Sequence, residues 1–232
     1  MPDKPNESDS RANDLADRLS DVAQRIAQAA QDIGRQPQEV TLIAVSKAQP
    51  PERIAAALAA GHRTFGENRV QQALEHWYER RSHYPDLRLH LIGGLQRNKV
   101  RQAVELFDVI ETVDRPKLVH ALADEIAKQK RDIACLIQVN TGREPQKSGV
   151  LPEDFPALLT QARTQGLPVA GLMCIPPAGH APAPHFAALA DMASQAGLPT
   201  LSMGMSHDYA QAIHQGATHV RVGTAIFGDR PG

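Results

Sequence analysis

The chain has 232 residues, of which 42% are hydrophobic and only 4% aromatic, so it can form one large domain whose core consists of Ala, Leu, Ile and Val. Its 25 basic and 26 acidic residues give a formal net charge of -1 without long runs of either sign, which argues against a nucleic-acid-binding surface. The sequence shows no signal segment and no apolar stretch of bilayer length, so we expect a cytoplasmic protein that does not contact membranes.

Residues 1–12 are polar, and we expect them to form a disordered tail ahead of a single domain over residues 13–232. From Asn13, apolar residues recur at steps of three or four as far as Ile33. This spacing predicts a helix with one apolar face, which ends at Gly34.

Residues 40–45 form a near-continuous apolar run, which Ser46, Lys47 and two prolines close. A run of this length with such an end predicts a buried parallel strand, because prolines cannot continue the hydrogen-bond ladder. Ligands bind at the carboxyl ends of parallel strands in α/β proteins, so Lys47 is the first candidate for chemistry. The alternative is an ordinary solvated lysine at the end of a strand.

Seven further strands are predicted along the chain, and helical patterns separate most of them. They cover residues 63–65, 87–92, 108–112, 133–139, 168–173, 199–203 and 218–222. Eight strands alternating with helices predict a single (β/α)8 TIM barrel. An open doubly wound sheet is the alternative, but it would need a Gly-rich dinucleotide turn where this chain has S-K-A-Q-P. Cys135 and Cys174 lie in apolar strand-like runs, so we expect core residues there and neither a disulfide nor a metal site.

The polar residues that follow the strands would form the active face of such a barrel. They are Lys47, Glu67, Asn68, Gln96, Asn98, Lys99, Asp114, Arg115, Asn140, Glu144, Lys147, the 173–177 loop, Ser206, His207, Asp208, Arg221, Gly223 and Thr224. Asp114 and Asp208 have a simpler interpretation as helix N-caps, and Pro116 suits the first turn of the helix that Asp114 would cap.

The sequence R-V-G-T at 221–224 ends the last strand and leads into a short helical stretch. Gly223 leaves backbone N–H groups accessible to a ligand, Thr224 adds a hydroxyl, and a helix start favours an anion. Barrels often bind phosphate in the loops after strands seven and eight, which adds Ser206 to this predicted phosphate site. The alternative is a Gly-Thr turn that only caps the terminal helix.

Lys47 and the predicted phosphate site follow the first and last strands, which are neighbours in a closed barrel. A lysine amine beside a fixed anion site suggests pyridoxal phosphate (PLP), whose aldehyde forms a Schiff base with lysine. Arg221 lies two residues before Gly223, so it faces the same side of the strand and could reach the pyridine nitrogen. Because arginine stays protonated, the ring would be a weaker electron sink than one paired with a carboxylate.

Eight segments of the sequence carry a family resemblance. They are A-V-S-K (44–47), F-G-E-N (65–68), H-L-I-G-G-L-Q-R-N-K (90–99), T-V-D-R (112–115), Q-V-N-T-G-R-E-P-Q-K-S-G (138–149), G-L-M-C-I-P (171–176), L-S-M-G-M-S-H-D (201–208) and A-I-H-Q-G-A-T-H-V-R-V-G-T-A-I-F-G (212–228). Together they resemble the YggS/PROSC type of pyridoxal phosphate homeostasis proteins. Departures are small: Leu91 stands where that family usually has an aromatic residue, and the loops at Pro177 and His207 look individual.

The resemblance implies a barrel like the cofactor domain of alanine racemase, in a protein that binds, buffers and delivers PLP inside the cell. It implies roles for six residues: Lys47 as the Schiff-base lysine, Arg221 near the ring nitrogen, Asn68 close to the cofactor, and Ser206, Gly223 and Thr224 on the phosphate. Apo PLP-dependent enzymes would be its partners, and we expect a monomer.

The competing hypothesis is a PLP-dependent amino-acid racemase or a related enzyme with low activity. A racemase that resembles this barrel needs a second acid/base group from a C-terminal β-domain, and the last predicted strand ends about ten residues before the chain does. We therefore expect no such domain and no catalytic turnover, and Tyr209 is the one tyrosine to test in that role. Lys99 and Lys147 are candidate secondary lysines for cofactor transfer, the alternative being that they are surface lysines.

Overall fold

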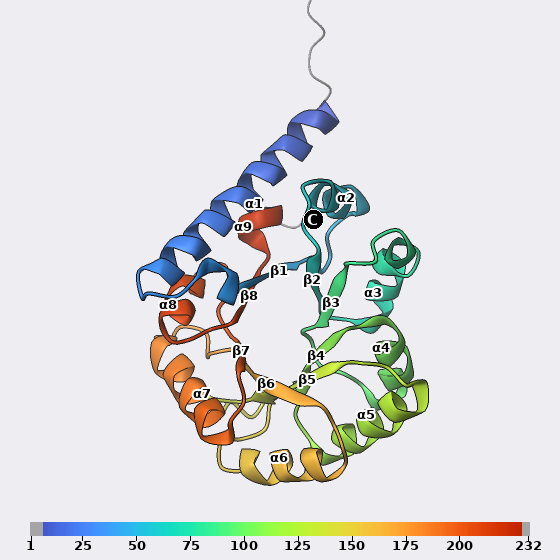
Figure 1. Ribbon diagram of the computed structural model, residues 1–232, viewed down its shortest axis with the longest axis vertical. Coiled ribbons are helices and arrows are strands. Elements are labelled where there is room, and N and C mark those ends of the chain that lie inside the picture. Colours follow the sequence, from blue (N-terminus) through green and yellow to red (C-terminus); the bar gives the residue numbers. More distant parts are fainter. Residues whose placement is uncertain (1–6, 229–232) are drawn as a thin grey trace, which may run out of the picture.

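Residues 7–228, which the computed structural model describes, form a closed barrel of eight parallel strands surrounded by helices (Figure 1). The strands are β1 (Thr41–Val45), β2 (Thr64–Glu67), β3 (Arg88–Leu91), β4 (Val109–Val113), β5 (Ala134–Val139), β6 (Val169–Cys174), β7 (Thr200–Ser202) and β8 (His219–Val222). Each strand pairs with the next one in sequence, and β8 pairs with β1, with Ile43 opposite Arg221. The predicted (β/α)8 barrel is therefore confirmed, and the open doubly wound sheet is wrong.

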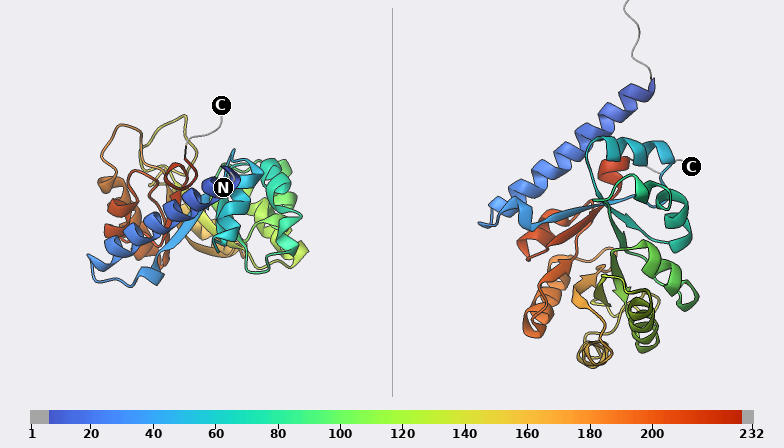
Figure 2. Two further views of the ribbon diagram at one scale, coloured as in Figure 1. Left: turned by 90° about the horizontal axis from the view of Figure 1, so that it is seen from above. Right: turned by 45° about the vertical axis from the view of Figure 1, so that its right-hand side comes forward.

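The helices lie outside the ring of strands, as Figures 1 and 2 show. They are α1 (Glu7–Gln31), α2 (Pro51–Ala59), α3 (Val70–Trp77), α4 (Val100–Leu106), α5 (Pro116–Gln129), α6 (Phe155–Thr164), α7 (Ala183–Ala196), α8 (Tyr209–His214) and α9 (Thr224–Phe227), with short 3₁₀ turns η1 (Pro37–Glu39), η2 (Arg80–Ser82) and η3 (Arg97–Lys99). The long helix α1 runs along the outside of the barrel and contacts α2, α8 and α9. It therefore covers the seam where β8 meets β1.

Proline and glycine mark several helix ends. Pro51 and Pro116 begin α2 and α5, where a missing N–H removes no helical hydrogen bond. Gly197 follows α7 in the left-handed conformation with a φ of 66°, which a residue without a Cβ adopts readily. These local signals fix where the chain leaves each helix and returns to the barrel.

The start of α1 differs from the prediction. The helix begins at Glu7, so residues 7–12 belong to it and not to the predicted tail, whereas residues 1–6 lie outside the described residues. Apolar spacing identifies a helix only where the helix packs, and the first polar turns carry no such signal. Ile33 was predicted on the apolar face, but it follows the end of the helix and is 42% exposed.

The start of α5 also differs from the prediction. Asp114 was interpreted as the N-cap, but Arg115 occupies that position and makes no side-chain cap bond. The Asp114 carboxylate instead pairs with the Arg115 guanidinium, which also donates to the Leu95 carbonyl at 2.7 Å. An ion pair with the neighbouring residue has replaced the capping interaction.

The core lies between strands and helices and within the ring. Trp77 and Phe107 are among its largest fully buried side chains. Cys135 and Cys174 are buried, and burial raises the pKa of each thiol to about 12, so both are core residues as predicted. Within residues 7–228, no helix is both long enough and apolar enough to cross a membrane.

Candidate functional site

Lys47 sits in a tight turn directly after β1. The Ser46 N–H donates to the Gly66 carbonyl on β2 at 3.1 Å, and the Gln49 N–H donates back to the Ser46 carbonyl at 3.1 Å. Between them Ala48 has a φ of 55°, a left-handed conformation that costs a residue with a Cβ about 1 kcal/mol. Such a strained residue suggests that the orientation of the turn carrying Lys47 matters to function.

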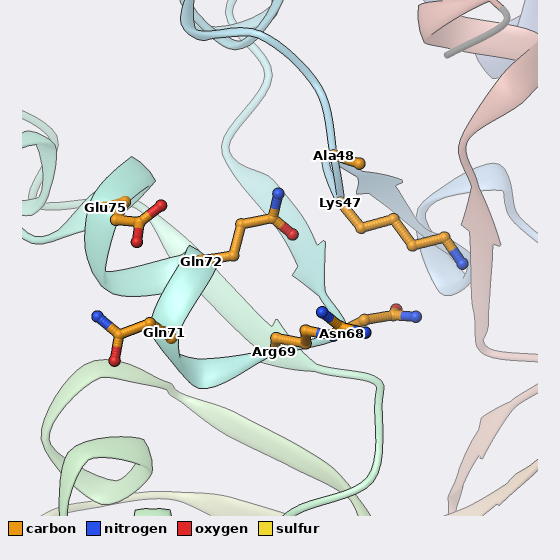
Figure 3. A pocket seen from close by; sticks show the side chains of 7 residues that line it. All are labelled: Lys47, Ala48, Asn68, Arg69, Gln71, Gln72 and Glu75. Atoms are coloured by element: carbon orange, nitrogen blue, oxygen red, sulfur yellow. The ribbon is translucent and has the colours of Figure 1, made fainter. Parts of the chain in front are cut away.

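A cavity of about 500 Å³ opens beside this turn, within the size range of small-ligand sites. Lys47, Asn68 and Arg69 line it together with polar residues of α3. Figure 3 shows the Lys47 ammonium and the Asn68 amide pointing to the same side, toward the C-terminal segment, while Gln71 and Glu75 lie on the other side of α3. The structure thus brings two of the six predicted cofactor residues together in one cavity.

Asn68 is held in place by close backbone packing. A Cβ built on Gly93, in the loop after β3, would lie 2.2 Å from the Asn68 carbonyl oxygen. No side chain fits in that space, so Gly93 is needed for the two loops to approach. The first glycine of the pair in the 90–99 segment therefore has a structural reason.

Ser206, Gly223 and Thr224 come together at the end of β8. The Gly223 N–H donates to Ser206 Oγ at 3.3 Å, and Thr224 begins α9 with its side chain exposed. A Cβ on Gly223 would lie 3.4 Å from the Cβ of Val45, so this group adjoins the end of β1. The predicted phosphate residues are therefore gathered at the strand next to the one that carries Lys47.

Arg221 lies inside the barrel and is only 3% exposed. Its guanidinium donates to Ser202 Oγ at 2.6 Å and to the Cys174 carbonyl at 2.8 Å. Glu111 Oε2 lies 3.9 Å from the same guanidinium. These contacts, which the sequence did not reveal, fix the arginine from three other strands.

Glu111 is the centre of this interior cluster and is fully buried. His90 Nδ1 lies 2.7 Å from its Oε1, and the Ser202 hydroxyl donates to its Oε2 at 2.6 Å. Burial alone would raise the pKa of Glu111, but the hydrogen bond and charge of His90, the charge of Arg221 and the Ser202 hydroxyl together hold it below its ordinary value. Glu111 is therefore ionised at neutral pH.

Glu67 was predicted on the open active face, and the structure corrects this. The side chain is fully buried at the end of β2. Its Oε1 accepts hydrogen bonds from Ser46 Oγ at 2.7 Å, His76 Nδ1 at 2.8 Å and Trp77 Nε1 at 3.1 Å. Glu67 thus ties the end of β1, next to Lys47, to helix α3. The apolar spacing of α3 shows only that one face of this helix packs inward, and it does not identify Glu67 as the acceptor for His76 and Trp77.

The two secondary lysines and Tyr209 lie outside the cavity that Lys47 lines. Lys147 forms an ion pair with Glu144 at 2.7 Å and donates to the Pro176 carbonyl at 3.5 Å. Lys99 ends the short turn η3. Neither lysine lines the cavity that contains Lys47. Tyr209 is buried on α8 and lines a different cavity, between α1 and α8, which also includes Ser206.

The arrangement suits a ligand that has an aldehyde, a phosphate and a ring nitrogen. Lys47 supplies an amine, the Ser206–Thr224 group supplies hydroxyls and backbone N–H, and Arg221 supplies a fixed guanidinium in the adjoining barrel interior. These donors match the three polar parts of PLP, so the residues fit this cofactor.

Comparisons with known proteins show the family. The family "Alanine racemase, N-terminal domain" matches residues 18–231. The pyridoxal phosphate homeostasis protein of Vibrio cholerae is 42% identical over 202 residues, which cover 82% of this chain and 86% of that protein. Its Escherichia coli K12 counterpart is 39% identical over 212 residues, covering 84% and 87%.

Solved structures extend the comparison. PipY of Synechococcus elongatus is 39% identical and covers 92% of this chain and 100% of its own, with a TM-score of 0.80 without PLP and 0.78 with PLP bound. Alanine racemase from Bartonella henselae has a TM-score of 0.71 at 17% identity, covering 95% of this chain and 60% of the racemase. At that identity the likeness extends to the fold alone.

Proposed function

Because the chain belongs to the family of pyridoxal phosphate homeostasis proteins, which shares the N-terminal domain of alanine racemase, we propose that it binds PLP and acts in the homeostasis of this cofactor. One structural observation supports the proposal independently of the family relationship. Lys47 follows β1, the Ser206–Gly223 pair follows β8, and the two strands are hydrogen-bonded neighbours. An amine and an anion site therefore lie side by side.

Each polar part of the cofactor has a partner in this proposal. PLP has an aldehyde that condenses reversibly with an amine, and Lys47 provides that amine. Ser206, Gly223 and Thr224 hold the phosphate, and Asn68 lies beside the cofactor. Arg221 donates to the ring nitrogen. Since a guanidinium keeps its protons, this pairing favours holding the cofactor over driving carbanion chemistry.

The wider role is a carrier of PLP in the cytoplasm. The protein, as a monomer, buffers the cofactor and delivers it to apo PLP-dependent enzymes. Lys147 and Lys99 are candidate acceptors of the aldehyde during release, because their loops lie at the same end of the barrel as Lys47. Sedimentation of the purified protein with and without PLP tests whether it is a monomer.

Titration with PLP tests the binding site. The wild type and Lys99→Ala should develop the absorbance of a lysine-bound cofactor, whereas Lys47→Ala should not. If Lys47→Ala and the wild type give the same titration, the assignment of Lys47 as the Schiff-base lysine is wrong. Delivery is tested by mixing the loaded protein with an apo PLP-dependent enzyme and following the recovery of that enzyme's activity.

Turnover is tested separately, since the racemase hypothesis predicts exchange at the α-carbon of an amino acid. The loaded protein is incubated in deuterium oxide with a panel of amino acids, and deuterium incorporation is measured. The carrier proposal predicts incorporation no faster than with free PLP. Faster incorporation that also requires Tyr209 would support the racemase instead.

A further inference from the structure

A line of polar side chains crosses the barrel interior beneath the site. It consists of His90 on β3, Glu111 on β4, Ser202 on β7 and Arg221 on β8, and each is at most 4% exposed. Barrel interiors are ordinarily filled by branched aliphatic side chains, and burying polar groups costs free energy unless they are paired. A buried polar line of this kind therefore calls for a role other than filling space.

The direction of each hydrogen bond in this line is determined. Arg221 can only donate, so Ser202 Oγ accepts from it and has its single proton left for Glu111 Oε2. An ionised Glu111 can only accept, so His90 Nδ1 carries the proton at the other end. Reversing any one bond would leave two donors or two acceptors facing each other.

Arg221 and Glu111 also carry opposite charges. A guanidinium with only 3% exposure is costly to bury without a counter-charge, and the Glu111 carboxylate lies 3.9 Å from the guanidinium of Arg221. The second anchor, the Cys174 carbonyl, fixes the plane of the guanidinium but supplies no charge. Glu111 thus provides both the negative charge and, through Ser202, the orientation.

We propose that Glu111 is a positioning residue for the cofactor site, which holds Arg221 through Ser202 in the orientation that donates to the ring nitrogen. The inference rests on the proposed function and adds to it a residue that does not touch the cofactor. A purely structural role for Glu111 would give the same loss of stability on substitution. A positioning role and a purely structural role of Glu111 are distinguished by the properties of the bound cofactor.

Two variants test the proposal, with a third as control. Ser202→Ala removes the acceptor of the Arg221 hydrogen bond, and Glu111→Gln keeps the shape of the side chain but removes its charge. Asp108→Asn is the control, because Asp108 is also a buried carboxylate but contacts Arg81 and the Leu89 N–H at the other end of β4.

The readouts are the absorbance spectrum of the PLP-loaded protein, the rate of PLP release and the thermal midpoint. Hydrogen bonding to the ring nitrogen tunes the electronics of the cofactor, so Ser202→Ala and Glu111→Gln should shift its absorbance band in the same direction. Release from Ser202→Ala should accelerate by roughly tenfold to a hundredfold, as expected for loss of a hydrogen bond to a charged group. Asp108→Asn should lower the thermal midpoint and leave spectrum and release unchanged.

The proposal is overturned if Ser202→Ala and Glu111→Gln keep the wild-type spectrum and release rate, whatever happens to the thermal midpoint. If Glu111→Gln does not fold, Ser202→Ala decides alone. A wild type that takes up no PLP would instead refute the proposed function. Borohydride labelling of Lys47 in both variants shows that the cofactor is still bound when its spectrum is read.

Discussion

Replacing Glu67 should destabilise the fold strongly, because one of its oxygens serves three donors in a fully buried place. Glu67→Ala leaves His76 and Trp77 without their Glu67 acceptor, and it leaves Ser46 Oγ with only the Gly66 carbonyl at 3.5 Å. Each buried donor left unpaired costs about 1–3 kcal/mol, so the free energy of unfolding should fall by about 3 kcal/mol. Glu67→Gln retains an acceptor oxygen and should recover more than half of that loss.

The chain offers a convenient assay, since Trp77 is its only tryptophan and bonds directly to Glu67. Urea unfolding followed by tryptophan fluorescence gives the midpoint and the slope. With a slope of about 2 kcal/mol per molar urea, the midpoint of Glu67→Ala should fall by roughly 1.5 M. If both variants lose less than about 1 kcal/mol, the three hydrogen bonds do not hold the end of β1 in place.

Three further predictions concern the loops and the barrel interior. Gly93→Ala should cost about 1–3 kcal/mol in urea unfolding, because its Cβ would lie 2.2 Å from the Asn68 carbonyl; a wild-type midpoint would contradict this. Burial, reinforced by His90, lowers the pKa of His219 to about 4, so the unfolded chain binds its proton first as pH falls below about 6.5. Between pH 7 and 4.5 the wild type should lose about 2.5 kcal/mol of stability that His219→Asn keeps, and equal losses would refute the assignment. Lys147→Ala should retain the cofactor absorbance and slow transfer to an apo-enzyme; loss of the absorbance would place Lys147 in the primary site.

Much of the fold follows from local pattern. The apolar run before Ser46, the prolines after it and the regular alternation of strands and helices were enough to predict the barrel and the end of β1 that carries Lys47. The neighbouring positions of Gly223 and Lys47 followed from ring closure alone. These features depend on short stretches of sequence or on topology.

The contacts in the barrel interior depend neither on short stretches of sequence nor on topology. Ser202 bonds to Glu111 across 91 positions of sequence, and Arg221 bonds to Cys174 across 47. A strand pattern shows that a residue faces inward or outward, but it does not show which partner on a distant strand receives its hydrogen bond. Glu67 was placed on the open face for the same reason, since its three donors come from other elements.

Borohydride reduction of the PLP-loaded protein, followed by peptide mapping by mass spectrometry, tests directly whether Lys47 binds the cofactor. We expect a single reduced-cofactor adduct, on the peptide that contains Lys47, and its loss in Lys47→Ala. An adduct on Lys99 or Lys147 with Lys47 unmodified, or no adduct in a protein that has taken up PLP, would contradict this expectation.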